Sequence, residues 1–233
     1  MDVDLKTIEL GHTFDYKELQ ERFRLIYGGV SFPGRRPGFT CIVGMTPERH
    51  FDSHNLYLLD EYESFDMRKL VRQCFALDRK SFISFNGYDR TDLPGRWLGP
   101  GKNDAAEMLI NEMNDEFNKD NSDDYPFTHN FSLNPSLLYE MKDLYPYLLS
   151  EIKSLVDSDS QQLFLKDSIV ANYLSGIMTG EVVDLQLGDF PAIEALGVVV
   201  AEMRKDDLAT RQSMRFRHRN FNAYANWSRF RRR

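Results

Sequence analysis

Five acidic residues stand at the predicted ends of strands or on a predicted closing helix: Asp60, Glu61, Asp89, Asp189 and Glu194. Ligand sites in α/β folds gather at strand ends and helix starts, so these carboxylates are expected to converge. Converging carboxylates bind Mg²⁺ or Mn²⁺, because hard cations prefer oxygen ligands. Two such ions can activate water and stabilise the leaving oxygen in phosphodiester cleavage. The alternative is that these acids are solvated surface residues, since the chain has 36 acidic residues in all.

The stretch GGVSFPGRRPGF, residues 28–39, is a glycine-rich turn between two short apolar runs. Enzymes often place a carboxylate where a strand runs into such a turn, but this chain has Ser31 there. A neutral hydroxyl is a poorer Mg²⁺ ligand than a carboxylate, so a metal site here would be weakened unless Asp60 or Glu61 compensates. Arg35 and Arg36 in the turn either contact phosphate groups or are simply exposed turn residues.

The elements that must position these residues follow from the spacing of apolar side chains. Strands are predicted at 25–31, 39–45, 54–64, 81–89 and 162–167. Helices are predicted from Phe14, at 65–77, at 104–117, at 136–156 with a kink or break at Pro146, at 168–178 and at 188–205. The stretch 90–104 is expected to be a loop and 118–130 a polar insertion. Strands joined through helices predict an α/β domain, with 39–45 and 54–64 forming an antiparallel hairpin.

The composition predicts a chain with a sizeable core and no membrane contact. The sequence has 233 residues, of which 42% are hydrophobic, and no apolar run approaches the roughly 18 residues of a membrane span. The N-terminus lacks the pattern of a signal peptide. Cys41 and Cys74 have no metal-ligand spacing and are predicted to be reduced core residues, as expected inside a cell.

The last 26 residues, 208–233, differ sharply in charge from the rest of the chain. They contain eight arginines and no acid, whereas the whole chain has a net charge of -7. Arginines that alternate with aromatic residues can neutralise phosphates and stack on bases, which predicts nucleic-acid contact. The residues expected to make it are Arg215, Arg217, Arg219, Trp227, Arg229 and Arg231. A solvated tail, docking on an acidic protein, and docking on the acidic body of this chain are the alternatives.

Four stretches in this order resemble the nuclease domain of the large terminase subunit of tailed bacteriophages: IYGGVSFPGRRPGF, LYLLDEYES, FNGYDRTDLPG and GDFPAIEALGVVVAEMRK. The resemblance covers about 180 residues and rests on order and local pattern. It implies a ribonuclease H-like mixed central sheet flanked by helices, over residues 23–207. A helical lead-in, 1–22, precedes that domain, and the basic tail follows it.

The resemblance also implies the chemistry of the site. Active members carry a metal-binding aspartate at the position of Ser31, while Asp89 matches the second ligand and Asp189, or Glu194, the third. The implied activity is Mg²⁺- or Mn²⁺-dependent cleavage of double-stranded viral DNA during packaging, in the cytoplasm of an infected bacterium. The alternative is a degenerate module that binds DNA or packaging proteins through its tail. No GxxxxGK[ST] loop occurs, so a separate packaging ATPase or a portal protein is an expected partner.

Overall fold

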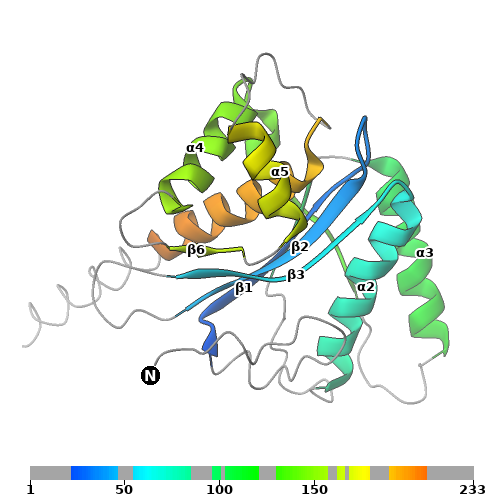
Figure 1. Cartoon of the computed structure of the whole chain (residues 1–233). Helices are drawn as coiled ribbons and strands as arrows, with labels where there is room; N and C mark the ends of the chain where they lie inside the picture. The colour runs from blue at the N-terminus through cyan, green and yellow to red at the C-terminus, as the bar shows by residue number, and fades with distance from the viewer. Residues whose placement is uncertain are drawn as a thin grey trace, which may run out of the picture.

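The structure is a computed structural model and describes residues 22–46, 55–84, 96–100, 103–120, 130–156, 162–165, 168–178 and 189–208. These residues build a mixed sheet with helices on both faces (Figure 1). The predicted α/β class is therefore confirmed. The predicted lead-in, the basic tail and the stretch that contains Asp89 lie outside the described residues.

Six strands form the sheet in the order β5-β4-β1-β2-β3-β6. Their bounds are β1 Leu25–Ser31, β2 Gly38–Met45, β3 Leu56–Ser64, β4 Arg96–Pro100, β5 Asn134–Ser136 and β6 Leu163–Phe164. β1, β2 and β3 pair in antiparallel fashion, which confirms the predicted hairpin. β4 runs parallel to β1, β5 parallel to β4, and β6 parallel to β3. The carboxyl ends of β1, β4 and β5 therefore lie on the same side of the sheet, where these parallel strands end.

The helices connect the strands and form the two outer layers. Their bounds are α2 Met67–Ser84, α3 Asp104–Asp120, the short 3₁₀ helix η2 Leu137–Glu140, α4 Leu144–Val156 and α5 Ile169–Met178. A last helix spans 191–208 and is called the closing helix here; Figure 1 draws it in orange. α2 and α3 lie on one face of the sheet, whereas α4, α5 and the closing helix lie on the other (Figure 1).

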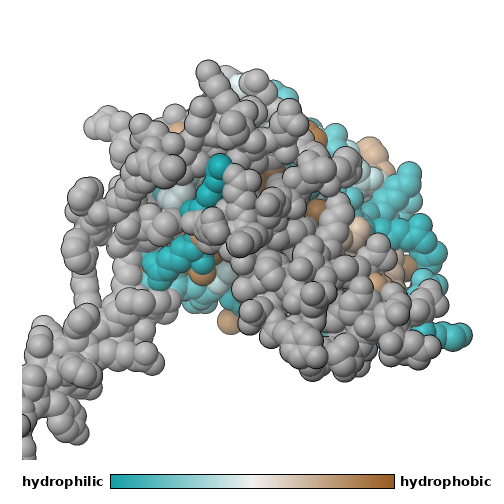
Figure 2. Space-filling view, turned by 90° about the horizontal axis from the view of Figure 1, so that it is seen from below, coloured by the Kyte–Doolittle hydropathy of each residue, from teal (hydrophilic) through white to brown (hydrophobic). Residues whose placement is uncertain are grey.

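Both faces of the central strands are buried, because each face packs against helices. Alternate residues of β2 enter two different apolar clusters: Cys41 and Val43 face the closing helix, and Ile42 faces α2 and α3. A strand that is covered on both sides reads as a continuous apolar run, and every residue of β2 is buried. The outer surface is hydrophilic where Figure 2 shows it on the side of α3, and hydrophobic residues appear there only as small separate patches.

Two adjacent glycines allow β1 to approach its neighbours on both faces. A Cβ atom on Gly28 would lie 2.4 Å from the ring of Trp97, and one on Gly29 would lie 2.6 Å from the main-chain oxygen of Ala195 in the closing helix. Real Cβ contacts are longer than this. Gly29 thus sets how closely the closing helix can lie on the strand that ends in Ser31, and Gly28 leaves room for Trp97 on the other face.

The fourth strand is not where the sequence placed it. Residues 81–84, predicted as part of a strand, continue α2, and the strand that follows is β4 at Arg96–Pro100, inside the stretch expected to be a loop. The stretch SFIS is rich in aromatic and β-branched residues, which favour strands, but it continues the helical register of α2. Arg96–Pro100 becomes a strand because it pairs with β1, a tertiary contact that local composition does not reveal.

The predicted helix 136–156 is divided, but not at Pro146. Asn134–Ser136 forms β5, a short edge strand that the sequence did not predict, η2 follows, and α4 begins at Leu144. Pro146 therefore lies in the first turn of α4, where its missing N–H costs no hydrogen bond. The helix at 104–117, the edge strand within 162–167 and the two last helices are confirmed.

Cys41 and Cys74 are free and buried, in agreement with the expectation of reduced core cysteines. Within the described residues, no helix combines the length and the apolar character that crossing a bilayer requires.

Candidate functional site at the end of β1

A buried serine and a buried glutamate meet where β1 ends. The Ser31 hydroxyl donates a hydrogen bond of 2.5 Å to the carboxylate of Glu194, and the side chains belong to residues only 2% and 1% exposed. Tyr145 of α4 donates a second hydrogen bond to the other oxygen of Glu194. The phenol oxygen of Tyr145 also accepts the main-chain N–H of Phe190 at 3.0 Å. The carboxylate thus has two hydroxyl donors, as a buried charge requires.

The pKa values of two tyrosines near this pair are raised. Burial, reinforced by the Glu194 carboxylate, raises the pKa of Tyr145. The same two causes raise the pKa of Tyr139 well above its ordinary value. Tyr139 donates to the main-chain oxygen of Val30 at 3.4 Å, directly before Ser31. Both phenols therefore stay protonated at neutral pH and act as hydrogen-bond donors around the end of β1.

The turn at 32–37, which follows Ser31, is fixed to the start of the closing helix. Arg36 places its guanidinium over two aromatic rings, 4.4 Å from the centroid of Phe190 and 5.4 Å from that of Tyr173. Arg35 forms an ion pair of 3.6 Å with Asp189, although its own side chain is 81% exposed. Such an exposed pair contributes at most about 1 kcal/mol. The stacked Arg36 is consequently the stronger link between the turn and the helix layer.

Glu61 is directed to the start of α5. Its carboxylate accepts the main-chain N–H of Ile169 at 2.6 Å and that of Val170 at 3.3 Å. Ser168 accepts the N–H of Ala171 at 3.0 Å, so α5 is capped by its own serine and by a glutamate from β3. Burial raises the pKa of Glu61, while the two N–H groups act against this rise.

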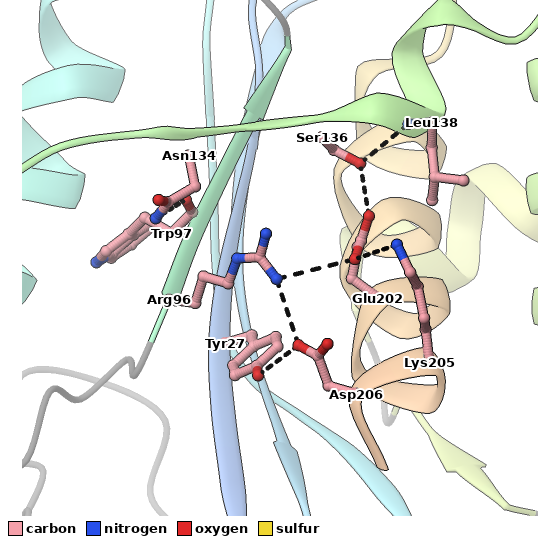
Figure 3. A network of polar contacts seen from close by, with 9 residues as sticks. All are labelled: Tyr27, Arg96, Trp97, Asn134, Ser136, Leu138, Glu202, Lys205 and Asp206. Carbon is pink, nitrogen blue, oxygen red and sulfur yellow. Dashed lines mark hydrogen bonds and ion pairs between the residues drawn. The ribbon is translucent and has the colours of Figure 1, made fainter. Parts of the chain in front are cut away.

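A second network of polar contacts joins the closing helix to β4, β5 and β1 (Figure 3). Glu202, only 3% exposed, accepts from the Ser136 hydroxyl at 3.2 Å and lies 3.8 Å from the guanidinium of Arg96. Asp206 accepts from the Tyr27 phenol at 2.8 Å and from Arg96 at 3.3 Å. Figure 3 shows Arg96 directed toward the closing helix, whereas the neighbouring Trp97 points to the opposite face of the sheet.

Of the residues that the sequence nominated, the structure brings five together at the end of β1: Ser31, Arg35, Arg36, Asp189 and Glu194. Ser31 pairs with Glu194 and Arg35 with Asp189, while Arg36 stacks on Phe190. Glu61 lies on the same face of the sheet, and its carboxylate is engaged by α5. Asp89 and the tail residues lie outside the described part of the chain, so their predicted roles stay predictions.

No group of three or more histidine, cysteine, aspartate or glutamate side chains that could hold a metal ion occurs within the described ranges. The donor set there also fits a two-ion site poorly. Glu194 accepts from two hydroxyls, Glu61 from two amides, and Asp189 faces Arg35. β4 ends in Gly99 and Pro100, so its described end supplies no side-chain ligand.

Sequence reasoning did not find Tyr145, Tyr139, Ser136, Glu202 or Arg96. One signal was available in the closing helix, where Glu194 and Glu202 interrupt an otherwise apolar stretch, AIEALGVVVAEM. A glutamate inside such a run is buried and needs donors from elsewhere. The sequence does not indicate which residues supply them, because the donors are distant in the chain. Tyr145 lies 49 positions before Glu194, and Ser136 lies 66 positions before Glu202.

No protein family matches this sequence, and neither a curated protein nor a solved structure is significantly similar to it. Function must therefore be argued from the chain itself.

Proposed function

We propose that this chain is a ribonuclease H-like module of the terminase-nuclease type, that it takes part in viral DNA packaging, and that its cleavage site is degenerate. In this proposal it binds double-stranded DNA without cutting it. The basic tail supplies one contact to the DNA. A separate packaging ATPase or a portal protein is the expected partner, in the cytoplasm of an infected bacterial host.

The sheet supports the fold part of this proposal. Three antiparallel strands, β3, β2 and β1, are followed in space by β4 and β5, both parallel to β1. α2 and α3 provide the connections from β3 to β4 and from β4 to β5, and they cover the face opposite the closing helix. This arrangement is compatible with the ribonuclease H-like class that the sequence resemblance implies. β6 extends the sheet beyond β3.

The hydrogen bond between Ser31 and Glu194 carries the conclusion that the site is degenerate. The resemblance expects two carboxylates here, which would repel each other unless a cation lay between them. Instead, a neutral hydroxyl donates directly to the remaining carboxylate, and Tyr145 satisfies its other oxygen. Both oxygens of the carboxylate thus have a donor within the protein, and the pair is closed to solvent. We therefore derive no catalytic step at this site.

The second candidate is an active endonuclease with Mg²⁺ or Mn²⁺. Asp189 and Glu194 at the start of the closing helix favour it, because the resemblance assigns both positions to ligands. Glu194 contacts Ser31 at the end of β1, and Asp189 pairs with Arg35 in the turn that follows. This candidate also requires Asp89 from outside the described residues. It assigns Asp89 and Asp189 as catalytic, with Glu194 and Glu61 as further ligands.

Plasmid nicking separates the two candidates. The full chain is incubated with supercoiled plasmid in Mn²⁺, Mg²⁺ or EDTA, beside the Asp89→Ala variant. The degenerate module leaves the plasmid intact in all three conditions. Metal-dependent nicking that disappears in Asp89→Ala would instead establish the active nuclease.

DNA binding is measured in parallel by gel shift. A full-length variant carries Arg215→Gln, Arg217→Gln, Arg219→Gln, Arg229→Gln and Arg231→Gln. Retarded plasmid for the wild type, and weaker retardation for this variant, are expected. Absence of wild-type binding at low salt would contradict the proposal that this chain handles DNA.

A further inference from the structure

The start of α2 carries a positively charged surface that the proposed site does not use. Three exposed cations, Arg68, Lys69 and Arg72, lie within five residues, and no acid occurs between Met67 and Leu77. At helical spacing, positions 68, 69 and 72 fall within about 100° of one another, so they share one face of the helix. We call these three residues the α2 stripe.

The α2 stripe is available for a partner. Arg68 is 55% exposed and forms only a long, exposed ion pair of 3.7 Å with Glu112 of α3. Lys69 and Arg72 form no ion pair within the residues that the structure describes. Phe65, 68% exposed, stands just before the helix.

The stripe adjoins the turn that follows Ser31. A Cβ atom on Gly38 would lie 2.5 Å from Leu70 of α2 and 2.7 Å from Pro33 of the turn, so the helix start and the turn both contact β2 at one point. Partly buried Phe32 and Met67 pack on the same apolar cluster. The start of α2 therefore lies close to the turn that follows Ser31.

A polyanion fits this surface better than a protein does. The stripe is a local concentration of positive charge in a chain whose net charge is -7, and it attracts negatively charged partners. The start of α2 is itself capped, since Asp66 accepts the N–H of Arg68 at 2.9 Å. The attraction thus comes from the side-chain cations, which are the usual contacts to nucleic-acid phosphates.

We propose that the α2 stripe binds the phosphate backbone of double-stranded DNA and is a second DNA contact on the folded domain, separate from the basic tail. This inference rests on the proposed function, because it concerns the same DNA. It places the duplex along the edge of the sheet where β1 ends.

The test uses the full chain and a short duplex of random sequence, with affinity measured at several salt concentrations. The variant is Lys69→Gln with Arg72→Gln. The matched control is Lys142→Gln with Lys153→Gln, two exposed lysines, one just before α4 and one in its last turn, on the other face of the sheet. Both double variants change the net charge by the same amount.

The α2 variant is expected to bind more weakly and with a flatter salt dependence. Each phosphate contact contributes about 0.9 to the slope of log affinity against log salt, which corresponds to about an eightfold change in affinity between 1 M and 0.1 M salt. Two lost contacts therefore lower the slope by about 1.8 and the affinity at 0.1 M by up to about 60-fold. The control is expected to keep the wild-type slope.

A charge-preserving variant, Lys69→Arg with Arg72→Lys, guards against effects on folding and should bind like the wild type. Equal losses in the α2 variant and the control would overturn the inference and leave only a general effect of charge. Wild-type binding in the α2 variant would also overturn it and would leave tail-mediated DNA binding intact. If the wild type itself does not bind the duplex, the inference and the proposed function fail together.

Discussion

At the scale of single residues, the site is defined by a neutral donor next to a buried acid. The Ser31 hydroxyl and the Tyr145 phenol satisfy Glu194, so the carboxylate needs no cation from outside. From the sequence, Ser31 and Glu194 could be named as candidate site residues, because both rest on local patterns. The tyrosines could not, since their role depends on how α4 lies on the sheet.

Ser31→Asp tests this arrangement directly. A second carboxylate beside Glu194 is expected to lower the free energy of unfolding by roughly 3–5 kcal/mol at neutral pH, because a buried charge loses its compensation. The repulsion raises the pKa of the introduced acid, so the loss should shrink as the pH falls and that acid is protonated. Denaturant unfolding at several pH values measures it. Ser31→Asn, which is neutral and of similar size, is the control; equal pH dependence in both variants would contradict the argument.

At the scale of elements, pairing decides what local composition leaves open. Arg96–Pro100 has the glycine and proline of a loop, yet it is the strand beside β1, and 81–84 has the residues of a strand, yet it ends α2. The long apolar elements, β1, β2 and the closing helix, were predictable because burial on both sides gives a strong signal. β4 and β5 were not, because short strands owe their structure to the neighbour they pair with.

α5 depends on an acid from another element, and its stability should therefore depend on pH. Burial raises the pKa of Glu61 above its usual 4.5, so Glu61 contributes fully to stability below that value and its contribution decreases as the pH rises through the raised pKa. Glu61→Gln removes this titration. The melting temperature of the wild type minus that of the variant should therefore become smaller as the pH rises from about 4 to about 7.

Comparing the two proteins at each pH cancels the titration of other acids, which both share. A difference that stays constant across this range, or that shifts in favour of the wild type, would show that the N–H groups of α5 outweigh burial at Glu61.

At the scale of the whole molecule, the closing helix holds the sheet together. Arg24 reaches Asp207 at 2.7 Å, and Glu194 meets Ser31 at the other end of β1, so the helix is tied to both ends of the central strand. Between these points its apolar residues lie in the cluster that covers that face of the sheet. A sheet flanked by helices could be expected from the sequence, whereas the contacts of the closing helix with Arg24 and Ser31 could not.

Two shortened chains should therefore behave differently. A chain that ends at Leu208 keeps all the contacts described above and is expected to unfold in one cooperative transition. A chain that ends at 188 lacks the closing helix and exposes the face of β1 that holds Gly29, and it should show no cooperative transition. Thermal unfolding followed by circular dichroism distinguishes them, and a cooperative transition in the shorter chain would refute this role of the closing helix.

The distance along the chain between β1 and the closing helix has a consequence for synthesis in the cell. Ser31 and Glu194 are 163 residues apart, and a ribosome adds about 5–20 residues per second. The closing helix is therefore synthesised roughly 8–33 s after β1. During that time the apolar face of the central strands lacks the closing helix, whose residues make up a large part of the cluster on that face. The nascent protein is thus exposed to aggregation for many seconds, and it should gain from chaperones that bind unfinished chains.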